Sequence, residues 1–149
     1  CCGRFASGVT VVTTRTPEGD HGMTISAFLS VALDPPLVCI SVGCSAKMLP
    51  KLRASGRYAV NILAEDMRAH ALHFAGRPDA SLRDLFEDRQ GLPVLRGAVA
   101  VLVTDVVQTV EAGDHVLLIG KVRHLELAPV ARPLLHHAGQ FGGVRTHTA

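Results

Sequence analysis

The chain of 149 residues carries a formal net charge of +2 at pH 7, with 48% hydrophobic and 19% charged residues. A chain of this length forms one substantial core, so we expect a single domain over residues 1–149. The balanced charge without a basic block argues against a nucleic-acid partner, and the lack of a long apolar run or signal peptide predicts a cytoplasmic protein outside the membrane.

The first third of the chain is predicted to be mainly β-strand. Its opening, CCGRF, is typical of the end of a helix, so we expect that a preceding helical segment has been truncated. Residues 9–14 (VTVVTT) are β-branched throughout and end at a turn, which predicts a strand. Further strands are expected at residues 22–26 and 37–43, separated by Pro35 and Pro36, which cannot donate to a ladder.

The middle of the chain is predicted to mix short helices with one strand. Residues 45–56 suggest a helix, with Ser45 as its N-cap and Gly56 as its stop. A strand is expected at residues 58–63. An amphipathic helix at residues 65–74 and a second short helix at residues 81–86 follow it.

The last third is predicted to form a long β-hairpin. Two β-rich runs, residues 98–111 and 115–127, are joined by a tight Ala-Gly-Asp turn. Strands therefore dominate, and there is no alternation of strand and helix. We expect a mostly β fold with helical insertions, arranged as an antiparallel barrel, rather than a doubly wound sheet.

Motifs of common nucleotide-binding and hydrolytic sites are absent from the sequence. There is no GxGxxG, GxxxxGK[ST] or GxSxG. His70 and His73 lack a suitably spaced third ligand and the four cysteines lack zinc-ligand spacing, so we expect no metal site and free thiols. Asp114 precedes His115 directly, and neighbours on a strand point to opposite faces. We therefore expect Asp114 to cap the turn rather than to orient the imidazole.

Two groups of polar residues suggest ligand contacts, and each has a structural alternative. Thr24 and Ser26 share one face of the second strand, either as partners of a ligand or as ordinary β-sheet residues. Ser45 and Lys47 lie at a predicted helix start, where unpaired N–H groups favour a phosphate. Alternatively, Ser45 only caps the helix and Lys47 is solvated. The residues alone leave both alternatives open.

Several segments in a characteristic order cover nearly the whole chain. They are RFASGVTVVTT (residues 4–14), GMTISAFLSVALDPPLVCISV (22–42), CSAK (44–47), YAVNIL (58–63), HFAG (73–76) and GDHVLLIGKV (113–122). Their combination resembles the flavin reductase family, the small reductase components of two-component flavin-dependent monooxygenases. The resemblance implies an antiparallel split β-barrel of the FMN-binding type and a homodimer. It also implies an NAD(P)H:flavin oxidoreductase that reduces FMN or FAD with NADH or NADPH and passes the reduced flavin to a partner monooxygenase.

The resemblance further implies which residues bind the cofactors. Residues beside the isoalloxazine ring and the ribityl chain would be Thr24, Ser26, Ala27, Phe28, Ser41 and Val42. Residues at the phosphate and on the helix side of the site would be Ser45, Ala46, Lys47, Phe74, Ala75 and Gly76. His115 would be the catalytic residue, donating a hydrogen bond or a proton to the reduced flavin. Phe141 would stack on the nicotinamide.

The chain departs from the family pattern in two places. Leu85 precedes Phe86 where the family often has a basic residue, with Arg83 as a substitute. Ala138 and Gln140 supply no charge in a C-terminal segment that is usually more basic. The alternative function is therefore a non-catalytic flavin-binding or flavin-carrier module. A split-barrel oxidase of a pyridoxamine phosphate would need a second basic cluster, which the sequence does not show.

Overall fold

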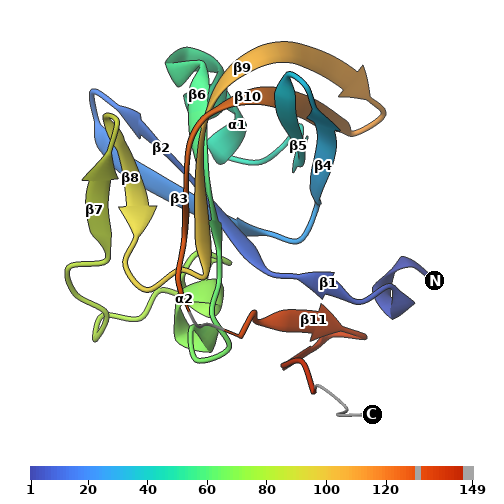
Figure 1. Ribbon diagram of the computed structural model, residues 1–149, viewed down its shortest axis with the longest axis vertical. Helices are drawn as coiled ribbons and strands as arrows, with labels where there is room; N and C mark the ends of the chain where they lie inside the picture. Colours follow the sequence, from blue (N-terminus) through green and yellow to red (C-terminus); the bar gives the residue numbers. More distant parts are fainter. Residues whose placement is uncertain (130–131, 146–149) are drawn as a thin grey trace.

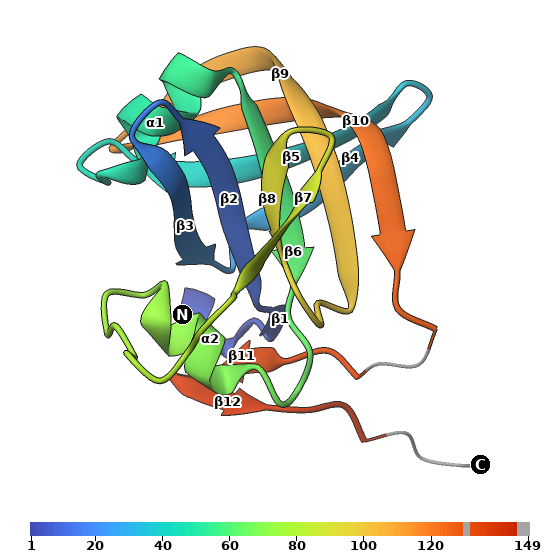
Figure 2. The same ribbon diagram turned by 90° about the vertical axis from the view of Figure 1, so that its left-hand side faces the viewer.

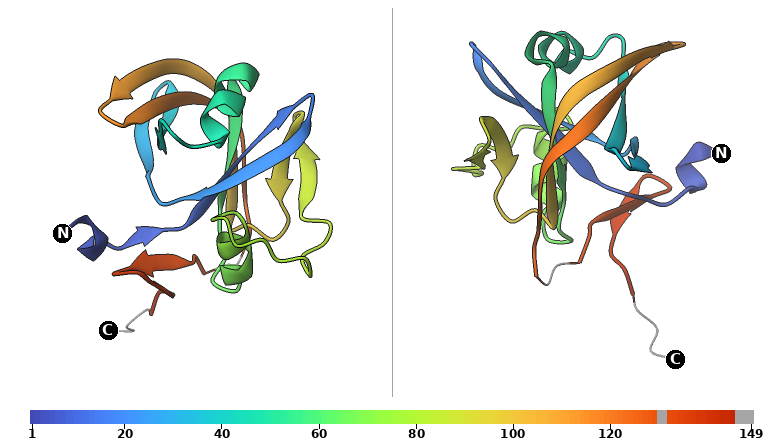
Figure 3. Two further views of the ribbon diagram at one scale, coloured as in Figure 1. Left: turned by 180° about the vertical axis from the view of Figure 1, so that it is seen from behind. Right: turned by 45° about the horizontal axis from the view of Figure 1, so that its top comes forward.

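The computed structural model describes residues 1–129 and 132–145. Its main body is a seven-stranded antiparallel sheet with the strand order β3-β2-β6-β9-β10-β5-β4. The sheet curls strongly, and the long hairpin of β9 and β10 arches over the upper part of the molecule (Figures 1 and 3). The mostly β, antiparallel architecture with few helices is as predicted.

The elements are short except for the hairpin strands. The strands are β1 (Ser7–Gly8), β2 (Thr10–Thr16), β3 (Gly19–Ile25), β4 (Phe28–Leu33), β5 (Pro36–Gly43), β6 (Arg57–Ile62), β7 (Phe86–Arg89), β8 (Leu92–Leu95), β9 (Ala100–Ala112), β10 (His115–Leu127), β11 (Leu135–His137) and β12 (Gln140–Gly142). The helices are the 3-10 turn η1 (Cys2–Arg4), α1 (Met48–Ser55) and α2 (Arg68–His73). None of the described helices has the length and apolar character needed to span a bilayer.

Helix α1 begins later than predicted. Lys47, not Ser45, is the residue directly before the helix. No side chain forms a capping hydrogen bond at this N-terminus. The Ala46 N–H donates instead to the Gly43 carbonyl over 2.9 Å, so this segment forms a turn before the helix. The predicted stop is confirmed, since Gly56 ends the helix with a φ of 65°, a left-handed conformation that glycine adopts readily.

The predicted helix at residues 81–86 is wrong. The Asp79 carboxylate accepts hydrogen bonds from the Ser81 backbone N–H and hydroxyl, which stabilises a turn instead of a helix. Asp84 has a positive φ of 46°, which is incompatible with a right-handed helix. The chain then enters β7 at Phe86 and forms a two-stranded hairpin with β8.

The described core has three clusters, and the smallest lies where β8 packs against β6 and β9. Helix α1 closes the barrel core with Met48, Leu49 and Leu52, which pack against Tyr58 and Val116. A second cluster lies around α2, whose Ala71 is fully buried in a group that includes Val11 of β2, Leu63 directly after β6, Leu95 of β8 and Leu134 of the C-terminal segment. This second cluster fixes α2 beneath the barrel.

The C-terminal segment returns beside the N-terminus. Strand β11 pairs with both β1 and β12, so the three form a small separate sheet. Figure 2 shows this sheet below the barrel, with α2 beside β11 and β12. Segments that are far apart in the sequence therefore meet around α2.

Candidate functional site

A cavity of about 660 Å³ lies between β3, the start of α1 and the segment that follows α2, and we call it the β3–α1 cavity. Strand β3 and α1 contribute Asp20, His21, Gly22, Met23, Thr24, Met48 and Lys51. The remaining lining residues are Ala46, Lys47, Phe74, Ala75 and Gly76. Half of this lining was predicted from the sequence to bind the flavin.

Thr24 fastens α2 to the edge strand β3. Its hydroxyl donates to the Ala71 carbonyl over 2.7 Å, and its backbone N–H donates to the Phe74 carbonyl over 3.1 Å. The hydroxyl oxygen keeps its capacity to accept a hydrogen bond from a ligand. Thr24 therefore supports the wall of the cavity in addition to lining it.

An aromatic ring and a glycine form one wall of the β3–α1 cavity. The Phe74 ring lies so close to Gly22 that a Cβ added there would be 2.7 Å from two ring carbons. Phe86 packs behind the Phe74 ring at a centroid distance of 5.8 Å, and His73 meets it edge-on at 4.8 Å. The ring is thus held in place and offers an apolar surface to a planar ligand.

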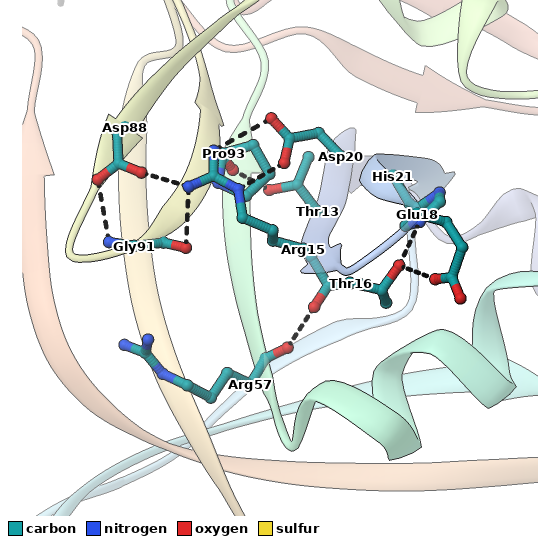
Figure 4. A network of polar contacts seen from close by, with 11 residues as sticks. Thr13, Arg15, Thr16, Glu18, Asp20, His21, Arg57, Asp88, Gly91 and Pro93 are labelled. Atoms are coloured by element: carbon teal, nitrogen blue, oxygen red, sulfur yellow. Dashed lines mark hydrogen bonds and ion pairs between the residues drawn. The ribbon is translucent and has the colours of Figure 1, made fainter.

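Two lysines bring positive charge to this cavity. Lys47 and Lys51 lie one helical turn apart, and within residues 1–129 and 132–145 neither forms an ion pair. The Lys51 ammonium lies 3.4 Å from Nε2 of His21. The same His21 nitrogen contacts the Thr16 hydroxyl at 2.8 Å, as Figure 4 shows. These cations are available to an anionic group such as a phosphate.

Figure 4 also shows how the edge strand β3 is held. Arg15 on β2 binds Asp20 on β3 and Asp88 on the β7–β8 hairpin, each with a shortest distance of 2.6 Å. Hydrogen bonds from the Gly91 N–H and from Arg15 hold the pKa of Asp88 below its usual range. The β7–β8 hairpin is thereby tied to β3, the strand that contributes five of the twelve residues lining the cavity.

A second, more apolar cavity of about 500 Å³ lies beyond the end of β3. Of the residues predicted to bind the flavin, it is lined by Ser26, Ala27, Phe28 and Ser41. The structure thus places Thr24 in one cavity and Ser26 in the other. Val42 lines neither, because its side chain is only 1% exposed within the barrel core, and Ser45 lies outside both on the surface.

His115 begins β10 opposite Gly43, and its ring lies over that glycine. Its Nδ1 is 2.7 Å from the Asp114 carboxylate, so the prediction that Asp114 does not orient the ring is wrong. Asp114 lies in the hairpin turn rather than in the strand, and strand alternation therefore does not separate the two side chains. The hydrogen bond from His115 lowers the pKa of Asp114. Because a carboxylate only accepts, Nδ1 carries the proton and Nε2 is left for a ligand.

A third cavity of about 560 Å³ lies between α2 and the β11–β12 hairpin, and we call it the α2–β12 cavity. It includes Phe141, which was predicted to contact the nicotinamide. It also includes Ala75, which lines the β3–α1 cavity as well. The two cavities therefore adjoin at Ala75. Within the described ranges, no group of three or more His, Cys, Asp or Glu residues has the arrangement of a metal site.

The family model described as a flavin reductase like domain matches residues 2–145. The chain belongs to this family. As a flavin reductase family member it is 46% identical over 142 residues to the NADH-dependent flavin reductase of a Rhodococcus species, covering 93% of this chain and 80% of the relative. It is 42% identical over 133 residues to the reductase component of 4-hydroxyphenylacetate 3-monooxygenase from Thermus thermophilus, covering 89% of this chain and 85% of the relative.

A solved structure agrees with this placement in the flavin reductase family. Flavin reductase PheA2 in its native state superposes with a TM-score of 0.93 at 43% identity, covering 97% of this chain and 94% of that chain. The predicted family and the predicted split-barrel fold are confirmed.

Sequence reasoning missed several residues that line the cavities of this flavin reductase family member. Lys51 lies on α1 four residues after Lys47, the residue that precedes the helix, and that spacing was a usable signal. Arg68, Arg77 and His136 line the α2–β12 cavity, and nothing in their local sequence indicates that they meet.

Proposed function

We propose that this chain is an NADH:flavin oxidoreductase that transfers a hydride to FMN or FAD and supplies reduced flavin to a separate monooxygenase. The enzyme class is supported by relatives that are named NADH-dependent flavin reductase and reductase component of a monooxygenase. Their names also favour NADH over NADPH as the hydride donor. A cytoplasmic location belongs to the same proposal.

The observation that carries the proposal is the pairing of an aromatic wall with a cationic wall in the β3–α1 cavity. Phe74 offers a surface on which an aromatic ring packs, and Lys47 and Lys51 offer charge to a phosphate. A bound flavin supplies the ring that accepts the hydride. The chain positions that ring and shields it from water, which is the protein's part in a cofactor-borne reaction.

We assign His115 the role of a donor to the reduced flavin. Asp114 holds its ring by Nδ1, and Nε2 then points away from that contact. When the ring is protonated, Nε2 donates a hydrogen bond or a proton to a negative charge that develops on a ligand. Leu117 follows two residues later on the same face of β10 and lines the apolar cavity with Ser41. His115 therefore lies at the end of the row of residues that borders this cavity, where Ser26, Ala27 and Phe28 are further proposed contacts of the flavin ring.

We also propose that the chain forms a homodimer through its exposed apolar side chains. Leu33 on β4 is 90% exposed and Leu127 at the end of β10 is 76% exposed. Phe5 is 82% exposed and Leu29 is 62% exposed, and both line the apolar cavity. Large apolar side chains in such numbers are typical of a protein–protein interface. Light scattering after size exclusion tests this: a Leu33→Lys variant that stays as large as the unmodified chain would count against this surface.

The experiment that tests the enzyme is anaerobic oxidation of NADH by the purified chain with FMN, FAD or riboflavin. We expect bleaching of the flavin absorbance at a rate proportional to the protein concentration. Tight flavin binding without NADH-dependent bleaching would instead identify a flavin carrier. Comparison of initial rates across the three flavins, each with NADH and NADPH, identifies the preferred pair.

A further inference from the structure

The α2–β12 cavity is lined by two arginines that have no acidic partner. Arg68 lies on α2 and Arg77 follows that helix, and within the described part of the chain neither forms a hydrogen bond or ion pair through its guanidinium. None of the described residues that line this cavity is acidic. Two unpaired guanidinium groups at one cavity favour an anionic ligand, and their planar donors match phosphate oxygens.

Several other arginines of the chain are paired with carboxylates. Arg15, Arg57 and Arg89 each contact a carboxylate at 2.9 Å or less. These pairs tie strands together and leave little charge for a ligand. Arg68 and Arg77 do not follow this pattern, and unlike Arg4 and Arg83, which also form no ion pair within the described residues, they line one cavity together.

An aromatic side chain holds Arg68 at the cavity. The Arg68 guanidinium carbon lies 5.7 Å from the centroid of the Phe141 ring, within the range of a cation–π interaction. His136 meets the same ring edge-on at a centroid distance of 5.6 Å. The β11–β12 hairpin therefore supplies an aromatic surface and α2 supplies the charge.

The position of this cavity relates it to the flavin. Ala75 lines both the α2–β12 cavity and the β3–α1 cavity, directly after Phe74 of the aromatic wall. A ligand that binds both must carry an anionic group and extend past Ala75 to a planar ring. A dinucleotide has that form, since its diphosphate lies between two ring systems.

We infer that Arg68 and Arg77 bind the diphosphate of NADH and thereby position its nicotinamide toward the flavin. This inference rests on the proposed function. It also explains why the C-terminal segment can carry the uncharged Ala138 and Gln140. The positive charge comes instead from Arg68 on α2 and from Arg77 after it. The diphosphate of FAD has the same chemistry, and the experiment separates the two sources.

The test uses the variants Arg68→Gln and Arg77→Gln, with Arg53→Gln as the matched control. Arg53 lies on α1, outside the α2–β12 cavity, and pairs with the exposed Glu111. Its replacement by glutamine changes the net charge by the same amount as the cavity variants. With FMN as acceptor, we expect each cavity variant to raise the KM for NADH about tenfold, since a charge-assisted hydrogen bond contributes roughly that factor. The kcat and the KM for FMN should stay within about twofold of the control.

A binding measurement without turnover gives the second readout. Titration calorimetry of the FMN-loaded chain with ADP-ribose, which keeps the diphosphate but lacks nicotinamide, should show weaker binding for both cavity variants. Arg68→Lys should restore part of the affinity, because it keeps the charge but not the planar donor pair. Both arginines are exposed, so thermal melting should match that of the control.

Several outcomes would overturn the inference. One is a KM for NADH and an ADP-ribose affinity that both match those of Arg53→Gln. Another is a raised KM for FAD with an unchanged KM for NADH, which would place the diphosphate of FAD in this cavity. If the unmodified chain does not oxidise NADH at all, the proposed function fails instead, and ADP-ribose binding still reports on the two arginines.

Discussion

The ring of Phe74 lies directly on the backbone of Gly22, where a side chain of any size would meet two ring carbons at 2.7 Å. Gly22 belongs to the edge strand β3, and Phe74 follows the short helix α2. The contact therefore joins the two elements that form the aromatic side of the β3–α1 cavity. Because Gly22 has no side chain, the Phe74 ring can lie against the β3 backbone, and this contact sets the shape of the cavity.

Gly22→Ala should weaken flavin binding. The added methyl group displaces the Phe74 ring into the cavity, and overpacking of this kind costs about 1–3 kcal/mol, which corresponds to roughly tenfold or more in an equilibrium constant. We expect the Kd for FMN, measured by fluorescence quenching, to rise about tenfold. Gly8→Ala is the control, because no atom lies within 4 Å of its added Cβ. Equal Kd values for the two variants would show that the Phe74 wall does not contact the flavin.

Lys47→Ala and Lys51→Ala should weaken the binding of FMN but not of riboflavin. Both lysines line the β3–α1 cavity, and only FMN carries a phosphate for them to bind. We expect each change to raise the Kd for FMN about tenfold at low salt, with a smaller effect at high salt because of screening. Lys121→Ala on β10 removes the same charge outside this cavity. If riboflavin binding falls as much as FMN binding, the lysines do not contact the phosphate.

The fold could be predicted where its signals are local. The long hairpin follows from two β-branched runs around a turn at Gly113, and the observed strands β9 and β10 match it closely. The start of α1 was predicted less accurately. The turn before Lys47 is stabilised by backbone hydrogen bonds, which do not depend on the type of side chain and therefore leave no signal in the sequence. Strand β4 was missed as a separate strand. Its Leu29 and Leu33 point to solvent, whereas patterning rules expect apolar residues to be buried.

The candidate site could be predicted only in part, for a related reason. The residues around Thr24 and Lys47 come from continuous motifs, and the structure brings them to one cavity. Arg68 and Phe141 meet because the C-terminal hairpin pairs with β1 and lies against α2. Such a meeting depends on long-range pairing, which the spacing of residues in the sequence does not encode.

His115→Gln should lower kcat by about two orders of magnitude if the imidazole donates to the reduced flavin. Asp114→Asn should lower kcat less, by about threefold to tenfold, because the amide oxygen still accepts from Nδ1 but carries no charge. The two effects should be non-additive, since Asp114 acts through His115, and the KM for FMN should not change. His124→Gln is the control, because His124 pairs with Glu126 at 2.8 Å elsewhere on β10. An equal loss of kcat in His124→Gln would point to a general effect of changing a histidine.

Asp105 should make the stability of the barrel depend on pH in the acid range. It joins three strands, since it binds Arg57 on β6 at 2.9 Å and Arg123 on β10 at 2.7 Å. Burial opposes its ionisation, but the hydrogen bonds from the two arginines outweigh this and lower its pKa. A lowered folded-state pKa means that the stabilisation is complete above the unfolded-state pKa near 4 and is lost as the pH falls through the folded-state pKa.

Asp105→Asn should therefore lower the free energy of unfolding by roughly 1 kcal/mol at pH 7, and this difference should vanish in strong acid. Urea denaturation across this pH range measures it, with the exposed Asp66→Asn as the control. A difference that stays constant down to the most acidic pH would show that the arginines do not act on the Asp105 charge.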